Sequence, residues 1–165
     1  MRRRDREMPA EFALMVLDKC AYATLATTNP DGTPYSTPIT IVREGACIYF
    51  HGALHGKKAD NLRARPTICL SCVGETKVVP AYFTTEFESA VVTGIAQEVT
   101  EDEEKIHALR LLAERYTPDN MLHFDTAVAE SLSRTAIWKI TITEISGKRK
   151  KYDAKGVEMK FGRME

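Results

Sequence analysis

The chain has 165 residues, of which 44% are hydrophobic and 28% charged, a composition typical of a soluble globular domain of ordinary size. Its 23 basic and 23 acidic side chains cancel, so the overall charge gives no reason to expect nucleic acid or an anionic membrane as a partner. No apolar run is long enough to span a bilayer or to form a signal-peptide core. We therefore expect a cytoplasmic protein with neither kind of partner.

We expect one domain over residues 1–150 and a basic tail over residues 151–165. Seven basic and three acidic side chains lie between Lys148 and Glu165. A run of like charges is most often a solvated extension. Nucleic-acid binding by the tail is the weaker alternative.

In the first half of the chain, the pattern predicts one helix, closely spaced strands and a second short helix. The first helix begins at Pro9, which suits a first turn, and the second ends before Pro66. Two prolines, Pro34 and Pro38, place one strand at an edge or a bulge, because proline lacks a backbone donor. The helices are expected over 9–19 and 57–63, and the strands over 21–28, 33–42, 46–50 and 67–73.

In the second half, the pattern predicts a loop, two strands and two helices between them. Thr100 and Glu103 have the spacing of a capping box, which predicts a helix start. The loop is expected over 75–85, the strands over 87–99 and 135–145, and the helices from about 101 to 116 and over 119–131. About six strands in hairpin order predict a mainly β fold, a small antiparallel barrel with helices packed outside.

Cys69 and Cys72 have a C-x-x-C spacing but lie in a predicted strand. Residues three apart in a strand point to opposite faces. We therefore expect neither a disulfide nor a shared metal here, and we predict no metal site.

The most informative stretch is "YFHGALHGKKADNL", residues 49–62. The strand is expected to end at Phe50, and Lys57 and Lys58 then open a helix. Two cations at a helix start oppose the helix dipole, whereas backbone N–H groups, a nearby glycine and added lysines would suit a bound phosphate. A solvated lysine pair is the other interpretation.

Five short motifs follow one another along the first half of the chain: Asn-Pro-Asp-Gly-Thr-Pro (29–34), Thr-Pro-Ile-Thr-Ile (37–41), Phe-His-Gly-Ala (50–53), Gly-Lys-Lys (56–58) and Asn-Leu (61–62). In the order and spacing of these motifs, the chain resembles the FMN-binding split-barrel superfamily, which includes pyridoxamine phosphate oxidase. Within it, the nitroimidazole-resistance branch is the most similar. The resemblance implies a six-stranded antiparallel split barrel and a homodimer with FMN between the subunits.

The resemblance also implies which residues contact the flavin. It assigns the phosphate to Lys57 and Lys58 after Gly56, and the neighbouring strand end to His51 and Gly52. It assigns the isoalloxazine edge to the strand residues Thr37, Pro38, Ile39 and Thr40. Ser89 stands where the oxidase has a flavin-contacting glutamine. The oxidase's residues for pyridoxal phosphate have no evident counterpart, which disfavours vitamin B6 oxidation.

Several side chains have more than one interpretation. His51 can serve in chemistry, because imidazole titrates near neutral pH, or can only hydrogen-bond to backbone or phosphate. Trp138 can contact the flavin, lie at the dimer interface or belong to the core. The aromatic side chains of Tyr82, Phe83 and Phe87 can form a lid over the cleft or pack under a long loop.

These observations favour an FMN-dependent reductase of a small molecule such as a nitroaromatic compound. NAD(P)H is the expected electron donor and would bind transiently, because no G-x-G-x-x-G fingerprint is present. One alternative is a flavin-binding carrier or sensor. Another is a haem-binding split barrel with His51 or His55 as axial ligand.

Overall fold

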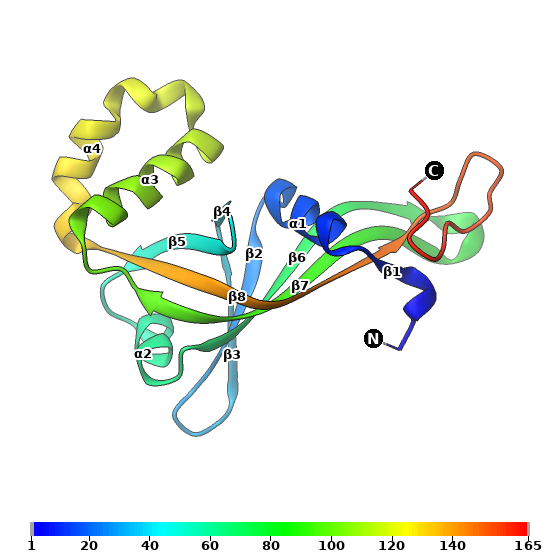
Figure 1. Cartoon of the computed structure of the whole chain (residues 1–165), viewed down its shortest axis with the longest axis horizontal. Helices are drawn as coiled ribbons and strands as arrows, with labels where there is room; N and C mark the ends of the chain where they lie inside the picture. Colours follow the sequence, from blue (N-terminus) through cyan, green and yellow to red (C-terminus); the bar gives the residue numbers. More distant parts are fainter. Residues whose placement is uncertain (1, 165) are drawn as a thin grey trace.

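An antiparallel sheet of eight strands runs through the length of the computed structural model, which describes residues 2–164 (Figure 1). The strand order is β3-β2-β6-β7-β8-β5-β4, and β1 also pairs with β8. The strands are β1 (Glu7–Met8), β2 (Ala23–Thr28), β3 (Pro34–Ile39), β4 (Val42–Glu44), β5 (Cys47–Ala53), β6 (Thr67–Val79), β7 (Thr84–Glu98) and β8 (Thr135–Lys150).

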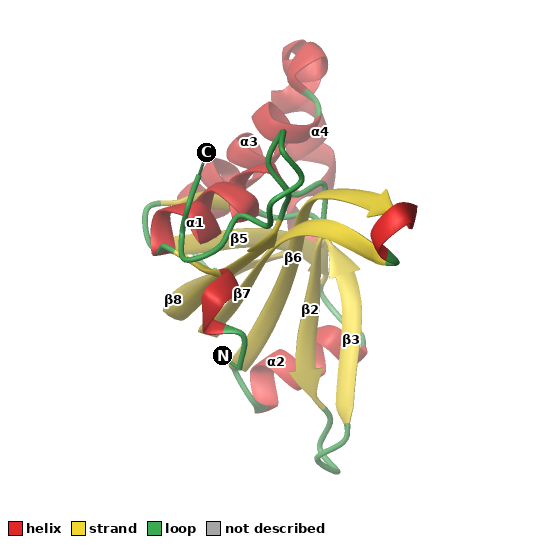
Figure 2. Ribbon diagram, turned by 90° about the vertical axis from the view of Figure 1, so that its right-hand side faces the viewer, coloured by secondary structure: helices red, strands yellow, loops and turns green. Residues whose placement is uncertain are grey.

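The predicted mainly β, antiparallel fold with inserted helices is confirmed. The strand count differs from the prediction, because the sheet has eight strands rather than six. Among residues 2–164, the strand pairings do not close the sheet into a barrel. Figure 2 shows the strong twist of the open sheet.

The strand predicted over 33–42 is two strands, β3 and β4, which pair with different neighbours. The break follows Pro38 and lies at Ile41. The backbone N–H and carbonyl of Ile41 hydrogen-bond to the hydroxyl of Tyr116, at 3.2 and 2.9 Å. A helix side chain thus takes the place of a strand partner at this point.

The segment predicted as a loop over 75–85 is mostly strand. β6 continues to Val79 and β7 begins at Thr84, with a register shift between Val73 and Thr76 and a 3-10 turn, η2 (Pro80–Tyr82), at the tip. Most of this stretch is exposed, Val78 and Phe83 included, so it lacks the alternation of buried and exposed residues that marks a half-buried strand.

Phe83 at this tip is 99% exposed. Figure 1 shows the hairpin at the opposite end of the molecule from α3 and α4. The predicted lid of Tyr82, Phe83 and Phe87 therefore does not form over His51 within one chain.

The main core lies between the sheet and α1 (Ala10–Lys19). Four α1 side chains are buried there: Phe12, Ala13, Val16 and Leu17. Gly147 of β8 allows the close approach, because a Cβ at this position would lie 3.1 Å from the Cβ of Ala13.

A second, smaller core lies at the other end of the sheet, beneath a helical lobe. The lobe consists of α3 (Asp102–Tyr116), η3 (Pro118–His123), α4 (Phe124–Ser131) and η4 (Leu132–Arg134). The predicted capping box is wrong: Glu101 is the N-cap residue and no side chain caps the helix. Instead, the hydroxyl of Thr100 donates to Glu101.

The C-terminal tail folds back on the beginning of the chain, which differs from the expected solvated extension. Arg6, in η1 (Arg4–Arg6), pairs with Glu158 at 2.6 Å. The backbone N–H of Phe161 donates to the carbonyl of Asp5, and Met159 is buried. The ion pairs of the tail offset part of its positive charge.

The four cysteines are free, and Cys69 and Cys72 differ in burial as expected for opposite faces of a strand. Among residues 2–164, no cluster of three or more His, Cys, Asp or Glu side chains could hold a metal ion. Within the same residues, no helix is both long and apolar enough to span a membrane.

Candidate functional site

The short helix α2 (Lys57–Ala64) is held in place by a buried polar contact with the β2–β3 hairpin. The side-chain amide of Asn61, which is 1% exposed, donates to Thr27 Oγ1 at 3.1 Å and to Asn29 Oδ1 at 2.9 Å. Gly56 precedes the helix with a φ of +124°, a conformation that favours glycine. The helix start is therefore fixed relative to the sheet.

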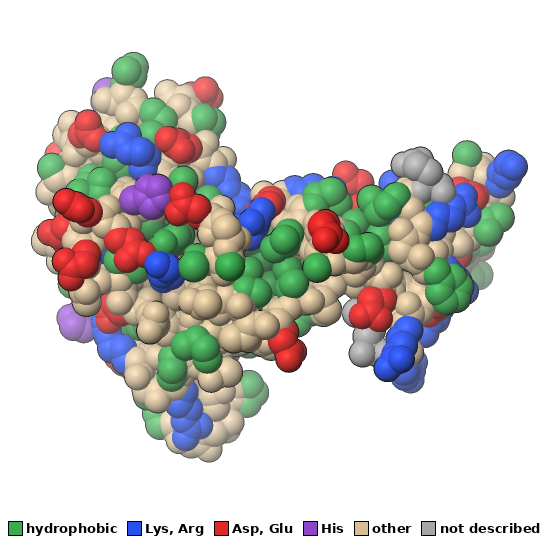
Figure 3. Space-filling model, in the orientation of Figure 1, with side chains coloured by type: hydrophobic (Ala, Val, Ile, Leu, Met, Phe, Trp, Pro, Cys, Tyr) green, Lys and Arg blue, Asp and Glu red, His purple; other side chains and the backbone are tan. Residues whose placement is uncertain are grey.

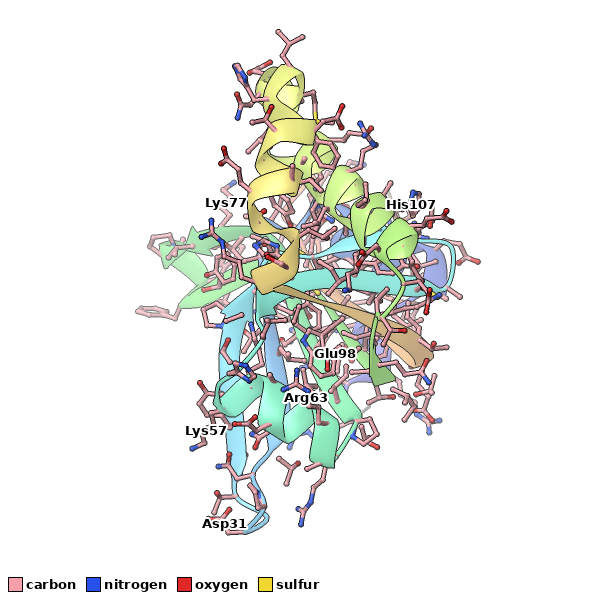
Figure 4. The ribbon with its side chains drawn as sticks, turned by 90° about the vertical axis from the view of Figure 1, so that its left-hand side faces the viewer. Asp31, Lys57, Arg63, Lys77, Glu98 and His107 are labelled. Carbon is pink, nitrogen blue, oxygen red and sulfur yellow. The ribbon has the colours of Figure 1, made fainter. Side chains whose placement is uncertain are left out.

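Lys57 and Lys58 stand at this helix start without an ion pair. Hydrogen bonds from Thr33 lower the pKa of Asp31, and the charge of Lys57 lowers it further from beyond ion-pair distance. Among the described residues, neither ammonium forms an ion pair or a hydrogen bond. Lys57 Nζ lies 4.8 Å from the ring centre of Tyr35, and Lys58 Nζ lies 5.4 Å from that of Phe50. In contrast, Arg63 at the end of the same helix pairs with Glu98 at 2.8 Å (Figure 4).

The two lysines border a cleft of about 260 Å³. Its other walls come from β3, the end of β5 and the loop before α2: Tyr35, Thr37, Ala53, His55, Gly56 and Ala59. Burial lowers the pKa of Lys58, which means that the fold desolvates this cation without pairing it. The cleft thus combines two cations with the free N–H groups of a helix start.

His51 lies within β5, which continues to Ala53, so the prediction that the strand ends at Phe50 is wrong. Residues 47–53 form a continuous ladder with β8, in which His51 pairs with Ile137. Side chains alternate along a strand. Phe50 and Gly52 face α2, where a Cβ on Gly52 would lie 3.4 Å from Lys58 Nζ. His51 faces the helical lobe.

A second cleft, of about 310 Å³, lies between His51 and the helical lobe. Its apolar walls are Leu109, Leu112, Ala113, Phe124, Ala127 and Val128. Its polar side chains are Thr40, His51, Tyr116, Thr117 and Ser131. Desolvation lowers the pKa of His51, and the charge of Lys58 lowers it further.

These two clefts contain most of the residues that the sequence places at the site. Thr37, Gly56, Lys57 and Lys58 line the first cleft, and Thr40 and His51 line the second. Comparison with protein families then gives one match: the model for pyridoxamine 5′-phosphate oxidase matches residues 10–149. The chain belongs to the pyridoxamine 5′-phosphate oxidase family. The family is a flavin-binding one.

Solved structures of other proteins share the fold of this family member. A candidate 5-nitroimidazole antibiotic resistance protein from Bacteroides thetaiotaomicron is 24% identical, with a TM-score of 0.73 over 86% of this chain and 84% of that one. An FAD-binding protein from Mesorhizobium loti is 23% identical, with a TM-score of 0.66 over 87% and 96%.

An FAD- and haem-binding protein from Mycobacterium smegmatis is 22% identical, with a TM-score of 0.73 over 88% of this chain and 73% of that one. At these identities the similarity shows a common fold. A comparison with curated proteins found no significant match.

Two side chains expected at the site of this family member lie elsewhere in the single chain. Trp138 is 1% exposed in the main core, stacked on Phe50 with the ring centres 6.4 Å apart. Ser89 lies on β7, nine residues from Glu98, which pairs with Arg63 of α2. At strand spacing, nine residues correspond to roughly 30 Å. The Ser89 hydroxyl is 3.5 Å from the carbonyl of Lys148. Neither side chain lines the clefts described above.

Pro38 and Ile39 also lie outside both clefts: Pro38 is exposed and Ile39 is buried in the main core. Sequence analysis did not predict the helical wall of the second cleft. Its residues come from two helices that fold over β5, and only the small side chains Ala113, Ala127 and Val128 signal the space between them.

Proposed function

We propose that this chain binds FMN and acts as a reductase of a small molecule. The observation that supports it is the pair of unpartnered lysines at the start of α2. A desolvated cation without an anion costs stability, and a phosphate would remove that cost. Family membership makes a flavin phosphate the natural candidate.

The residues of the first cleft suit this group. Lys57 and Lys58 would balance the phosphate charge, and the N–H groups after Gly56 would donate hydrogen bonds to it. The flavin ring would run from this cleft toward Thr40 along the backbone of β3. When bound, FMN would supply the hydride or electron transfer.

His51 is the side chain proposed to assist chemistry. It lies in the cleft next to Thr40, and no hydrogen bond holds its imidazole among the described residues. A neutral imidazole can orient a substrate by a hydrogen bond, and an imidazolium can donate a proton. NAD(P)H would be the transient electron donor.

We propose further that the protein is a homodimer with FMN at the subunit interface. Apolar side chains of the sheet face that points away from α1 remain exposed: Val73 at 52%, Val91 at 42% and Ile95 at 37%. A second copy covering this face would bury them. It could also bring Ser89 to the partner's flavin, which one chain cannot do alone.

The experiment is to purify the protein, record its absorption spectrum and measure NAD(P)H-dependent reduction of a nitroimidazole. A flavin spectrum with turnover supports the reductase, and a flavin spectrum without turnover supports the carrier or sensor. Light scattering at micromolar concentration tests the dimer. A fully FMN-loaded monomer would refute the shared site.

Haem is the second candidate ligand, because His51 is free to act as an axial ligand. The same spectrum decides between the two, since haem has an intense Soret band and flavin does not. His51→Ala would abolish that band if the haem assignment were correct. In that case, His51→Ala would leave the affinity for FMN unchanged.

A further inference from the structure

The polar side chains of the cleft between His51 and the helical lobe are mostly engaged within the protein. The hydroxyl of Tyr116 donates to the carbonyl of Ile41 at 2.9 Å. The hydroxyls of Thr117 and Ser131 donate to helix carbonyls, at 3.1 and 2.6 Å. These three groups offer little hydrogen bonding to a ligand.

Thr40 and His51 differ from them. Thr40 is exposed, and no hydrogen bond of the Thr40 hydroxyl or the His51 imidazole to another described residue is present. Both side chains come from the sheet side of the cleft, whereas the opposite wall is formed by α3 and α4. The available polar groups are therefore gathered on one wall, facing an apolar one.

The cleft also lacks a compensating charge for an ionic ligand. None of its lining residues is Lys, Arg, Asp or Glu. Arg110, whose guanidinium lies 4.2 Å from the ring of Phe124, is paired with Asp125 at 3.2 Å. A carboxylate or ammonium entering this space would lose hydration without forming an ion pair with a lining residue, and the charge of Lys58, which acts on His51, comes from the opposite face of β5.

The size of the cleft sets a further limit. Its volume of about 310 Å³ lies at the lower end of the range of roughly 300 to 1,000 Å³ that is typical of ligand sites. It has room for a small ring compound.

We propose that this cleft is the substrate subsite and selects small, uncharged ring compounds that carry a hydrogen-bonding group. The ring lies against α3 and α4, and the polar group faces Thr40 and His51. The role of the cleft as a substrate subsite rests on the proposed reductase function. Its preference for uncharged compounds does not, and binding measurements alone can test it.

The test uses two probes of similar size and different charge, 4-nitrobenzyl alcohol and 4-nitrobenzoate. Their binding to the flavin-free and FMN-loaded full chain is followed by NMR titration. Ala127→Trp places a bulky ring in the cleft, and Ala129→Trp is its control, because Ala129 is an exposed residue of the same helix outside the cleft.

We expect the uncharged probe to bind at least tenfold more tightly than the carboxylate. Ala127→Trp should weaken its binding at least tenfold, and Ala129→Trp by less than twofold. Equal affinity for both probes, or equal effects of the two variants, would overturn the assignment. Circular dichroism verifies that both variants are folded.

Separate titration with FMN distinguishes the two proposals. Binding of FMN without selective binding of the uncharged probe would overturn the cleft assignment and leave the flavin site. Selective probe binding in a chain that does not bind FMN would support the cleft and refute the proposed function. Thr40→Val, which removes a hydroxyl at nearly constant volume, should weaken the alcohol probe about threefold or more.

Discussion

Replacement of Lys58 by methionine tests the phosphate site most directly. Methionine keeps an apolar stem of similar length over the ring of Phe50 and removes only the charge. A hydrogen bond to a charged group contributes about 1.5 to 3 kcal/mol, so FMN affinity should fall roughly 10- to 150-fold. Riboflavin affinity should change by less than threefold, because riboflavin has no phosphate.

Lys58→Met should lower FMN affinity, but it should not lower the stability of the flavin-free protein. Burial lowers the pKa of Lys58, so the folded state disfavours its charged form. This cost is fully present below the lowered pKa of the folded state, and it fades as the pH rises from that pKa to the ordinary value of 10.5. Lys58→Met should therefore leave the melting temperature unchanged or raise it.

Fluorescence quenching of both flavins measures the affinities, and differential scanning fluorimetry measures stability. Lys58→Arg keeps the charge and should retain most of the FMN affinity. Lys155→Met is the control for loss of an exposed lysine, because Lys155 lies in the C-terminal tail. Equal losses of FMN and riboflavin, or a strongly destabilised flavin-free variant, would refute the reasoning.

Three further predictions concern single residues. The NMR titration midpoint of His51 should lie below 6.5 and rise when phosphate neutralises Lys58. His51→Gln should reduce the stability lost as the pH falls from 7 to 5, because the partly desolvated neutral imidazole must become charged. Gly94→Ala should destabilise the fold by about 1 to 3 kcal/mol in urea unfolding, since its Cβ would lie 2.6 Å from the carbonyl of Thr141. Asn61→Leu should cost about 1 to 3 kcal/mol in the same assay, because it leaves buried acceptors of the β2–β3 hairpin without a donor. An unshifted His51, or variants of Gly94 and Asn61 as stable as the parent, would contradict the corresponding argument.

The sequence predicted those elements in which apolar residues recur at a regular interval. The helices α1 and α2 and the strand β8 were found because their apolar residues recur on one face or lie between clear stop signals. The extension of β6 to Val79 was missed because its side chains there are mostly exposed and do not alternate between buried and exposed positions. Its pairing with β7 comes from backbone hydrogen bonds, which leave no hydrophobic pattern.

The candidate site was only partly predictable for a similar reason. The lysines at 57 and 58 are adjacent in sequence and stand at a helix start, so local chemistry reveals them. The core position of Trp138 and the helical wall opposite His51 depend on which elements fold together. A single polar residue in a strand with alternating side chains does not indicate which element packs against its face of the sheet.

That alternation explains how β5 serves two different environments. Phe50 and Gly52 point toward α2, where Lys58 supplies charge, while His51 between them points toward an apolar cleft. The phosphate of FMN and an uncharged substrate would therefore be recognised in two separate clefts, one on each side of the strand. If the phosphate and the substrate were recognised by one shared set of groups, Lys58→Met would weaken the uncharged probe as much as FMN. Because the two sets lie on opposite faces of β5, it should not.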